Sequence, residues 1–385
     1  MKNPTYLKFR LLLITLVLCM SGTTWAGTAY VANEGSATVS VIDTATNFIV
    51  ATIGLGSDPA IAGTPQPNGP YNGDADHHKA FYNGHADTHG LWLTPDGATL
   101  LVTNRLSGTV VAIDTATNTV LGYTPVGREP HLATVRPGGR EAWVAVRGEN
   151  YIDVLKLDHD LLRKSTLRRT GRMPVVATVD TMNGPSMVSF TSNGRHAFVV
   201  SGKQNRVDKF DATERKLLAS QTLPANFTPF GMVTPDNEEI YLVHKGAGTL
   251  SILSTDDLDF IVRGMPIGAR ANHVFFVGRL AYITVGGATP SASNPDPLGK
   301  VVVLDRKTRT VVREFTGPDF SGEPHGIWAT GDGKLYVGHE GGNRVTVIAI
   351  GNPDNATDDL LVGIVGGTPD QLAFLKKPID IVVKP

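Results

Sequence analysis

Cysteine is nearly missing from this sequence, because Cys19 is the only one among 385 residues. A single thiol forms no internal disulfide and provides no set of thiolate ligands, so we expect no haem of the c type, no Cys-type zinc site and no iron–sulfur cluster. An excess of charge of one sign is missing too, since 35 basic residues balance 36 acidic residues to a net charge of −1. Such a chain has no field that attracts nucleic acid or an anionic membrane, and neither is an expected partner.

Long apolar segments are also absent. The apolar run over residues 11–20 has ten residues, whereas a membrane-spanning helix needs about 20, so no membrane span is expected. The run follows a positively charged start and precedes small residues that end in Ala26, a pattern typical of a secretory signal peptide. We therefore expect residues 1–26 to be a signal peptide that is cleaved after Ala26. The mature chain, from Gly27, is predicted to be periplasmic or secreted and to lack cysteine.

Internal repetition is the strongest feature that the chain does contain. The sequence Asp-Thr-Ala-Thr-Asn at residues 43–47 returns letter for letter at residues 114–118, each time after a β-branched run. Tight turns of the Pro-Asp-Gly type, such as residues 95–97, separate other short runs. One unit therefore contains strand A, a tight turn, strand B, a loop, strand C, an Asp-rich turn and strand D.

The spacing of these units predicts the fold. The A strands are expected to start near residues 89, 131, 186, 230, 273 and 325, at intervals of 42 to 55 residues, which suits one four-stranded propeller blade per repeat. Residues 28–33 form a B strand without its own A strand, and residues 379–383 form an A strand without a blade. Pairing the two completes a seventh blade. The prediction is an all-β, seven-bladed β-propeller over residues 27–385, a single domain closed by its terminal strands.

Three sequence elements carry a resemblance to a known group of repeat proteins. They are the Tyr/Leu-Val-x-Asn element at Tyr30 and Leu101, the Ile-Asp-Thr-Ala-Thr-Asn turn, and the Pro-x-Gly start of the A strands. Together they resemble YVTN-family propellers over nearly all of the chain after residue 26. The resemblance implies the propeller fold and leaves the function open, because propellers host many chemistries.

The histidines gather on one predicted face. In a propeller the starts of A strands, the ends of B strands and the D–A loops share one face, called the top face here. Nine of the eleven histidines map to it. Four start A strands next to the axis, two end B strands, and three lie in the long insertion at residues 56–88, which we expect to act as a lid or a ligand-bearing flap. In that order they are His89, His131, His273 and His325; His244 and His339; and His77, His78 and His85.

Such a cluster predicts a metal site, because imidazole is the commonest metal-ligating side chain. Without thiolates, imidazole suits a transition metal, with copper favoured and zinc or iron compatible. The axial plan resembles the catalytic domains of nitrous oxide reductase and thiocyanate dehydrogenase, which implies multinuclear copper held on axial histidines. The chain lacks a cysteine-bearing cupredoxin domain, and this argues against nitrous oxide reduction by the chain alone. The alternative for each histidine is a structural hydrogen bond in the channel mouth.

Charged residues that follow the B strands are expected to line the same mouth. Arg105, Arg147, Lys245 and Glu340 are the candidates for a rim that orients a small polar or anionic substrate, and the alternative is a set of solvated loop charges. Three functions are compatible with these features. They are a copper-dependent oxidoreductase acting on a small molecule, a non-catalytic propeller that binds a periplasmic partner protein, and a metal-assisted lyase or hydrolase resembling the virginiamycin-type lyases. The sequence does not decide whether the chain is an enzyme.

Overall fold

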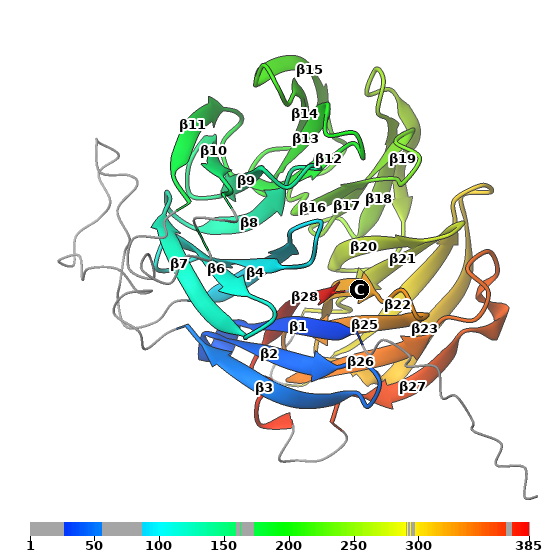
Figure 1. Ribbon diagram of the computed structural model, residues 1–385. Coiled ribbons are helices and arrows are strands. Elements are labelled where there is room, and N and C mark those ends of the chain that lie inside the picture. Colours follow the sequence, from blue (N-terminus) through cyan, green and yellow to red (C-terminus); the bar gives the residue numbers. More distant parts are fainter. Residues whose placement is uncertain are drawn as a thin grey trace, which may run out of the picture.

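The computed structural model describes residues 27–55, 87–158, 162, 173–289, 291, 293, 297–366 and 372–384. In these ranges the chain forms seven four-stranded antiparallel sheets that stand as blades in a ring (Figure 1). The predicted all-β, seven-bladed propeller is confirmed. In the part of the chain so described, we find no helix with the length and hydropathy that a membrane crossing requires.

Each blade runs from an innermost strand A at the axis to an outermost strand D. Blades 1 to 3 are β28 (Pro378–Lys384), β1 (Thr28–Asn33), β2 (Thr38–Asp43) and β3 (Phe48–Gly54); β4 (Thr88–Leu93), β5 (Thr99–Asn104), β6 (Thr109–Asp114) and β7 (Thr119–Pro125); β8 (Pro130–Val135), β9 (Glu141–Val146), β10 (Tyr151–Lys156) and β11 (Val175–Asp180). Blades 4 and 5 are β12 (Pro185–Phe190), β13 (His196–Ser201), β14 (Arg206–Asp211) and β15 (Lys216–Thr222); β16 (Phe230–Val233), β17 (Glu239–His244), β18 (Thr249–Ser254) and β19 (Phe260–Pro266). Blades 6 and 7 are β20 (Ala271–Val277), β21 (Leu280–Val285), β22 (Leu298–Asp305) and β23 (Thr310–Ser321); β24 (Pro324–Ala329), β25 (Lys334–His339), β26 (Arg344–Ala349) and β27 (Leu360–Ile364). Two 3-10 turns, η1 (Glu34–Ser36) and η3 (Ala356–Asp358), complete the regular structure of these ranges.

The two ends of the chain close the ring, as predicted. Strand β28, red in Figure 1, pairs antiparallel with the blue strand β1, and the register places Thr28 opposite Lys384 and Val31 opposite Ile381. Blade 1 therefore takes its A strand from the end of the chain and its other three strands from the beginning. This pairing covers the edge that β1 would otherwise expose.

The repeated Asp-Thr-Ala-Thr-Asn motif forms the turn between strands C and D. In blade 2 the Asp114 carboxylate accepts the backbone N–H groups of Ala116 and Thr117 at 2.8 and 2.9 Å. Asn118 ends the turn with a φ of 54°, a left-handed conformation that Asn tolerates. The turns that start at Asp211 and Asp305 keep the carboxylate and the left-handed last residue, but there the last residue is Arg215 or Arg309, with φ of 55° and 56°.

The repeated tyrosines of the B strands connect neighbouring blades. Tyr30 of blade 1 is fully buried and donates a hydrogen bond to Asn118 Oδ1 of blade 2 at 3.2 Å. Tyr336 of blade 7 makes the same contact, at 2.5 Å, with Asn47 Oδ1 of blade 1. The tyrosine and the turn asparagine of the repeat are therefore two halves of one contact between blades, which explains why both recur. These contacts fix the blades around the axis, where the candidate site lies.

Candidate functional site

The starts of the seven A strands converge on the axis at the top face. One side chain from the first three positions of each A strand contributes to a ring of seven. In blade order they are Ile379, His89, His131, Ser186, Phe230, His273 and His325. Apart from Ser186, all of them line a small axial cavity of about 10 Å³, which has room for about one water molecule or one ion. The structure therefore brings together all four histidines that were predicted to lie at the axis.

The axial histidines form two pairs of adjacent imidazoles. The ring centroids of His89 and His131 are 4.4 Å apart, and those of His273 and His325 are 4.7 Å apart. The two pairs meet at His89 and His325, whose ring centroids are 6.4 Å apart. The ring of Phe230 stacks on that of His273, with centroids 4.0 Å apart. Each of the four histidines is at most 7% exposed. The pairs therefore lie in a closed, mostly apolar environment.

The hydrogen bonds of the axial imidazoles indicate where their protons reside. His131 Nδ1 lies 2.8 Å from the carbonyl oxygen of Ser186, which can only accept, so Nδ1 carries the proton and Nε2 keeps its lone pair. His89 Nδ1 lies 3.3 Å from Glu34 Oε2, which assigns the same tautomer to His89. His325 Nδ1 is buried and has no hydrogen-bond partner among the described residues. Unprotonated imidazole nitrogens are thus present in the ring.

Burial keeps these imidazoles uncharged at neutral pH. Loss of solvation, followed by the positive charge of Arg105, lowers the pKa of His89 to about 3, although Glu34 opposes the shift. Burial likewise holds the pKa values of His131, His273 and His325 well below the ordinary value. At pH 7 the contact between His89 and Glu34 is consequently a hydrogen bond between a neutral ring and a carboxylate. Neutral imidazole is the form that binds metal ions.

The sequence analysis missed one carboxyl group at the axis. Asp380, on β28, lines the same cavity, and its Oδ1 lies 3.8 Å from His273 Nδ1. It accepts the backbone N–H groups of Leu91 and Ile381, both at 2.9 Å. Burial raises the pKa of Asp380 to about 7, against the opposing effect of these two hydrogen bonds. An alignment of the seven A strands would have revealed this carboxyl group. Asp380 is the only acidic residue at its position in the strand, which other blades fill with residues such as Gly90 and Leu132.

His244 and His339 require a correction, because both ring nitrogens of each are already engaged by other groups of the protein. His244 contacts the hydroxyl oxygens of Thr228 and Ser251 at 2.7 and 2.8 Å, one with each ring nitrogen. His339 contacts the carbonyl oxygen of Ser321 and the hydroxyl of Thr346, both at 2.9 Å. Neither ring has a free nitrogen, so these two histidines are structural and not the expected metal ligands.

The three loop histidines that were expected to complete the cluster, His77, His78 and His85, lie outside the described residues, as does most of the expected lid. The described chain resumes at Asp87, which precedes β4. The candidate site is accordingly built from the axial ring and the charged rim above it. On the described residues alone, no group of three or more His, Cys, Asp or Glu side chains is arranged to hold a metal ion.

One half of the rim is an ion-pair network around Glu34. Arg105 contacts Glu34 at 3.1 Å and Asp87 at 2.8 Å, and Lys377 contacts Glu34 at 2.6 Å. Burial alone would raise the pKa of Glu34, but its contacts with His89, Arg105 and Lys377 hold it below the ordinary value. Arg105 thus lies beside the axial ring, where it neutralises the carboxylate that orients His89.

The other half of the rim is centred on Lys245. Its ammonium lies 2.7 Å from Glu323 and 3.8 Å from Glu340, and Glu323 also pairs with Arg270. Burial lowers the pKa of Lys245 to about 8, although the charge of Glu340 opposes the shift. Glu340 in turn reaches the axial ring, with Oε2 3.9 Å from His325 Nε2. Lys245 and Glu340 therefore lie close to the axial ring.

Arg147 differs from the other rim cations, because it has no carboxylate partner among the described residues. Its Nε is buried without a hydrogen bond, and its guanidinium carbon lies 5.7 Å from the centre of the Phe227 ring. Burial and then the charge of Arg105 lower the pKa of Arg147, a shift that is never large enough to discharge a guanidinium at neutral pH. Among the described residues Arg147 therefore has no direct ion pair, although the charges of Glu129 and Glu34 act on it from a distance.

Comparisons with known proteins show similarity in fold only and identify no family. No protein-family model and no curated protein matches the sequence. Among solved structures, hydrazine synthase of Kuenenia stuttgartiensis is 17% identical and covers 82% of this chain and 90% of its own, with a TM-score of 0.60. A functionally unknown protein of Desulfotomaculum acetoxidans is 14% identical over 93% of this chain and 99% of its own, with a TM-score of 0.65. The dihydro-heme d1 dehydrogenase NirN, in complex with DHE, is 14% identical over 92% of this chain and 74% of its own, with a TM-score of 0.57.

Proposed function

We propose that the axial histidine ring binds a transition metal ion, with copper favoured over zinc and iron, and that the chain is an exported oxidoreductase for a small molecule at the top face. The observation that carries the proposal is the orientation of His131 and His89. In each ring a protein acceptor holds the Nδ1 proton and leaves Nε2 with its lone pair. Metal-ligating histidines are typically oriented in this way. Nδ1 of His325 is buried without a hydrogen bond. If it is unprotonated, it is a third nitrogen that can bind the metal ion, and if it carries the proton, it is a donor that a bound ligand would satisfy.

Copper follows from the chemistry of the donors. Residues 27–385 contain no cysteine, and neutral imidazoles remain as the main ligands. Imidazole suits copper, zinc, iron and nickel, and divalent copper binds most tightly of the series. Because the described nitrogens do not already surround one point, binding requires the imidazole pairs to turn toward each other. When bound, copper would supply one-electron chemistry.

The surrounding residues have separate roles in this proposal. Asp380, with a pKa of about 7, accepts or releases a proton next to His273. The unpaired guanidinium of Arg147 and the buried ammonium of Lys245 hold an anionic group of the substrate at the mouth. The proposal includes export through residues 1–26 and membership of the YVTN repeat group, which the contact between Tyr30 and Asn118 supports.

Metal content tests the proposal directly. Protein purified from the periplasm is loaded with copper, freed of excess metal and analysed by mass spectrometry and electron paramagnetic resonance. His131→Ala and His325→Ala should each lower the copper affinity at least about tenfold, since loss of even an orienting partner costs 10- to 100-fold. His196→Ala, at the start of the second strand of blade 4 and away from the axis, is the matched control and should bind copper like the wild type. Equal copper content in all four proteins contradicts the metal site and leaves a propeller that binds a partner protein.

A lyase or hydrolase that uses acid–base catalysis is the second candidate, and Asp380 favours it. A carboxyl group with a pKa of about 7 is suited to proton transfer at neutral pH. Under this alternative Asp380→Asn removes activity toward an anionic substrate without changing the copper content. Under the first proposal, removal of copper removes the activity.

A further inference from the structure

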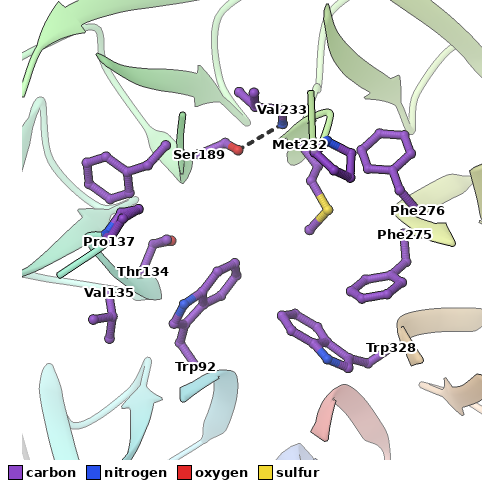
Figure 2. Close-up of a pocket in the computed structure, with 12 residues that line it drawn as sticks. Trp92, Thr134, Val135, Pro137, Ser189, Met232, Val233, Phe275, Phe276 and Trp328 are labelled. Atoms are coloured by element: carbon purple, nitrogen blue, oxygen red, sulfur yellow. Dashed lines mark hydrogen bonds between the residues drawn. The ribbon is translucent and has the colours of Figure 1, made fainter. Parts of the chain in front are cut away.

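A second pocket lies at the opposite, bottom end of the axis. It has a volume of about 260 Å³ and is formed where the A strands end. Figure 2 shows its aromatic walls, with Trp92 and Trp328 on one side and Phe275 beside them. Trp92 follows His89 by three residues on β4, so the pocket and the axial ring are about 10 Å apart along the strand. The two sites are therefore separate.

The walls of the pocket present aromatic faces and edges to its interior. The indole rings of Trp92 and Trp328 meet edge to face, with centroids 5.4 Å apart, and the rings of Phe275 and Trp328 are 4.7 Å apart. Figure 2 shows the thioether of Met232 between the aromatic groups. All four side chains are only partly buried by the described chain. Aromatic rings that line a concave site offer stacking and edge contacts to a flat molecule.

One polar group in the wall lacks a partner. Thr134 is 2% exposed, its hydroxyl has no hydrogen bond within the described residues, and Figure 2 shows its side chain directed toward the pocket. The other hydroxyl of the wall, Ser189 Oγ, already accepts the backbone N–H of Val233 at 2.9 Å. A buried hydroxyl without a hydrogen bond is unfavourable, and a ligand atom that bonds to it removes this cost.

The lack of charged side chains in the described wall of the pocket disfavours an ionic ligand. Arg306, whose guanidinium carbon lies 5.4 Å from the centre of the ring of the lining residue Phe276, already pairs with the carboxylate of Asp236. In the part of the chain that the structure describes, no ionisable side chain lines the pocket itself. A charged ligand would thus lose its hydration without gaining a counter-charge.

We propose that this bottom pocket binds an uncharged, planar aromatic molecule with one polar group that hydrogen bonds to Thr134. The aromatic walls provide the stacking surfaces, and the unpartnered hydroxyl provides the single directional contact. The site does not depend on the metal proposed at the top face, so either can fail without the other.

Two probes that differ by one hydroxyl test the proposal, namely naphthalene and 2-naphthol, with binding measured by equilibrium dialysis. Both should bind the wild-type protein in a saturable manner. Thr134→Val keeps the shape of the side chain and removes its hydroxyl, so it should weaken 2-naphthol about fivefold, as expected for one hydrogen bond, and leave naphthalene unchanged. Thr222→Val, on the exposed outer strand of blade 4, is the matched control and should change neither affinity.

A third variant checks the location of the site. Met232→Trp fills the pocket and should abolish the binding of both probes while the protein keeps its far-ultraviolet circular dichroism spectrum. Absence of saturable binding to the wild type overturns the proposal, as does equal weakening of both probes by Thr134→Val. Dimerisation that Met232→Trp disrupts, without binding of either probe, also overturns it and identifies a second copy of the chain as the occupant.

Discussion

The two histidines that end B strands should make the stability of the protein fall steeply in mild acid. His244 and His339 are fully buried, and burial lowers the pKa of His244 to about 4 and that of His339 to about 3. In the unfolded chain both titrate near 6.5. The unfolded state therefore binds more protons between these values. The contribution of each histidine to the free energy of unfolding is fully present above pH 6.5 and is lost as the pH falls toward 3 to 4.

The size of the effect follows from the distance between pH 5 and the unfolded pKa. This distance is about 1.5 units, and at 1.36 kcal/mol per unit it amounts to about 2 kcal/mol for each histidine. For the pair, His244 and His339, the loss at pH 5 is about 4 kcal/mol, a large part of a typical stability of 5–15 kcal/mol. The axial histidines act in the same direction and Asp380 acts in the opposite one, so a comparison with a variant is needed.

The repeat itself provides the right variant. Asn33 and Asn104 occupy the same B-strand ends in blades 1 and 2 and donate to neighbouring hydroxyls, as at Ser40 Oγ over 2.8 Å. A protein carrying both His244→Asn and His339→Asn lacks the two titrating groups. Urea unfolding of the metal-free proteins is measured at pH 7 and at pH 5.

The wild type should lose about 4 kcal/mol more than the double variant between pH 7 and pH 5, because only the wild type can take up the two protons on unfolding. A cavity left by the smaller asparagine affects both pH values equally and cancels in this difference. An equal loss in the two proteins would refute the reasoning that burial of these two imidazoles controls the acid sensitivity.

Three other predictions concern the closure, the axis and export. Deletion of residues 378–384 removes four buried aliphatic side chains, which at 1.5–3 kcal/mol each amounts to roughly 6–12 kcal/mol, so circular dichroism should show an unfolded chain at 25 °C. Gly326→Ala would place a Cβ 2.6 Å from the Cα of Asp380 and should lower the stability by about 1–3 kcal/mol in urea unfolding, without unfolding the protein. Cleavage after Ala26 should give a mature protein whose N-terminal sequence begins at Gly27, and a mature protein that retains Cys19 would contradict this.

The sequence predicted the fold well because its repeats encode local turn chemistry. The Asp114 turn and its copy at Asp43 mark the same C–D connection, so counting turns is equivalent to counting blades. The two unpaired strands at the ends of the chain could then both be covered only by pairing with each other. The pairing of β1 with β28, with Val31 opposite Ile381, confirms this prediction. Such signals are local in the chain and need no knowledge of distant contacts.

The site was less predictable because hydrogen-bond partners come from other elements. Sequence placed His131 and His339 on the same face, but it could not show that His131 keeps one nitrogen free while Ser321 and Thr346 use both nitrogens of His339. The bottom pocket also escaped notice, although Trp92 and Trp328 each follow an axial histidine by three residues. This equal spacing places both indoles at the same height along the axis, and it could have been used to predict an aromatic pocket there.

The number of engaged ring nitrogens separates the two kinds of histidine in this propeller. At the B-strand ends, a hydroxyl or a carbonyl satisfies each nitrogen of His244 and His339, and burial then costs no hydrogen bond. At the axis a carbonyl oxygen engages Nδ1 of His131 and a carboxylate engages Nδ1 of His89, and the centroids of the two rings lie 4.4 Å apart. Burial keeps both rings neutral, so each retains an unprotonated Nε2 that can bind a metal ion. Binding of a metal ion would not require either ring to ionise, and for this reason the proposed metal site is the axial ring and not the histidines of the B strands.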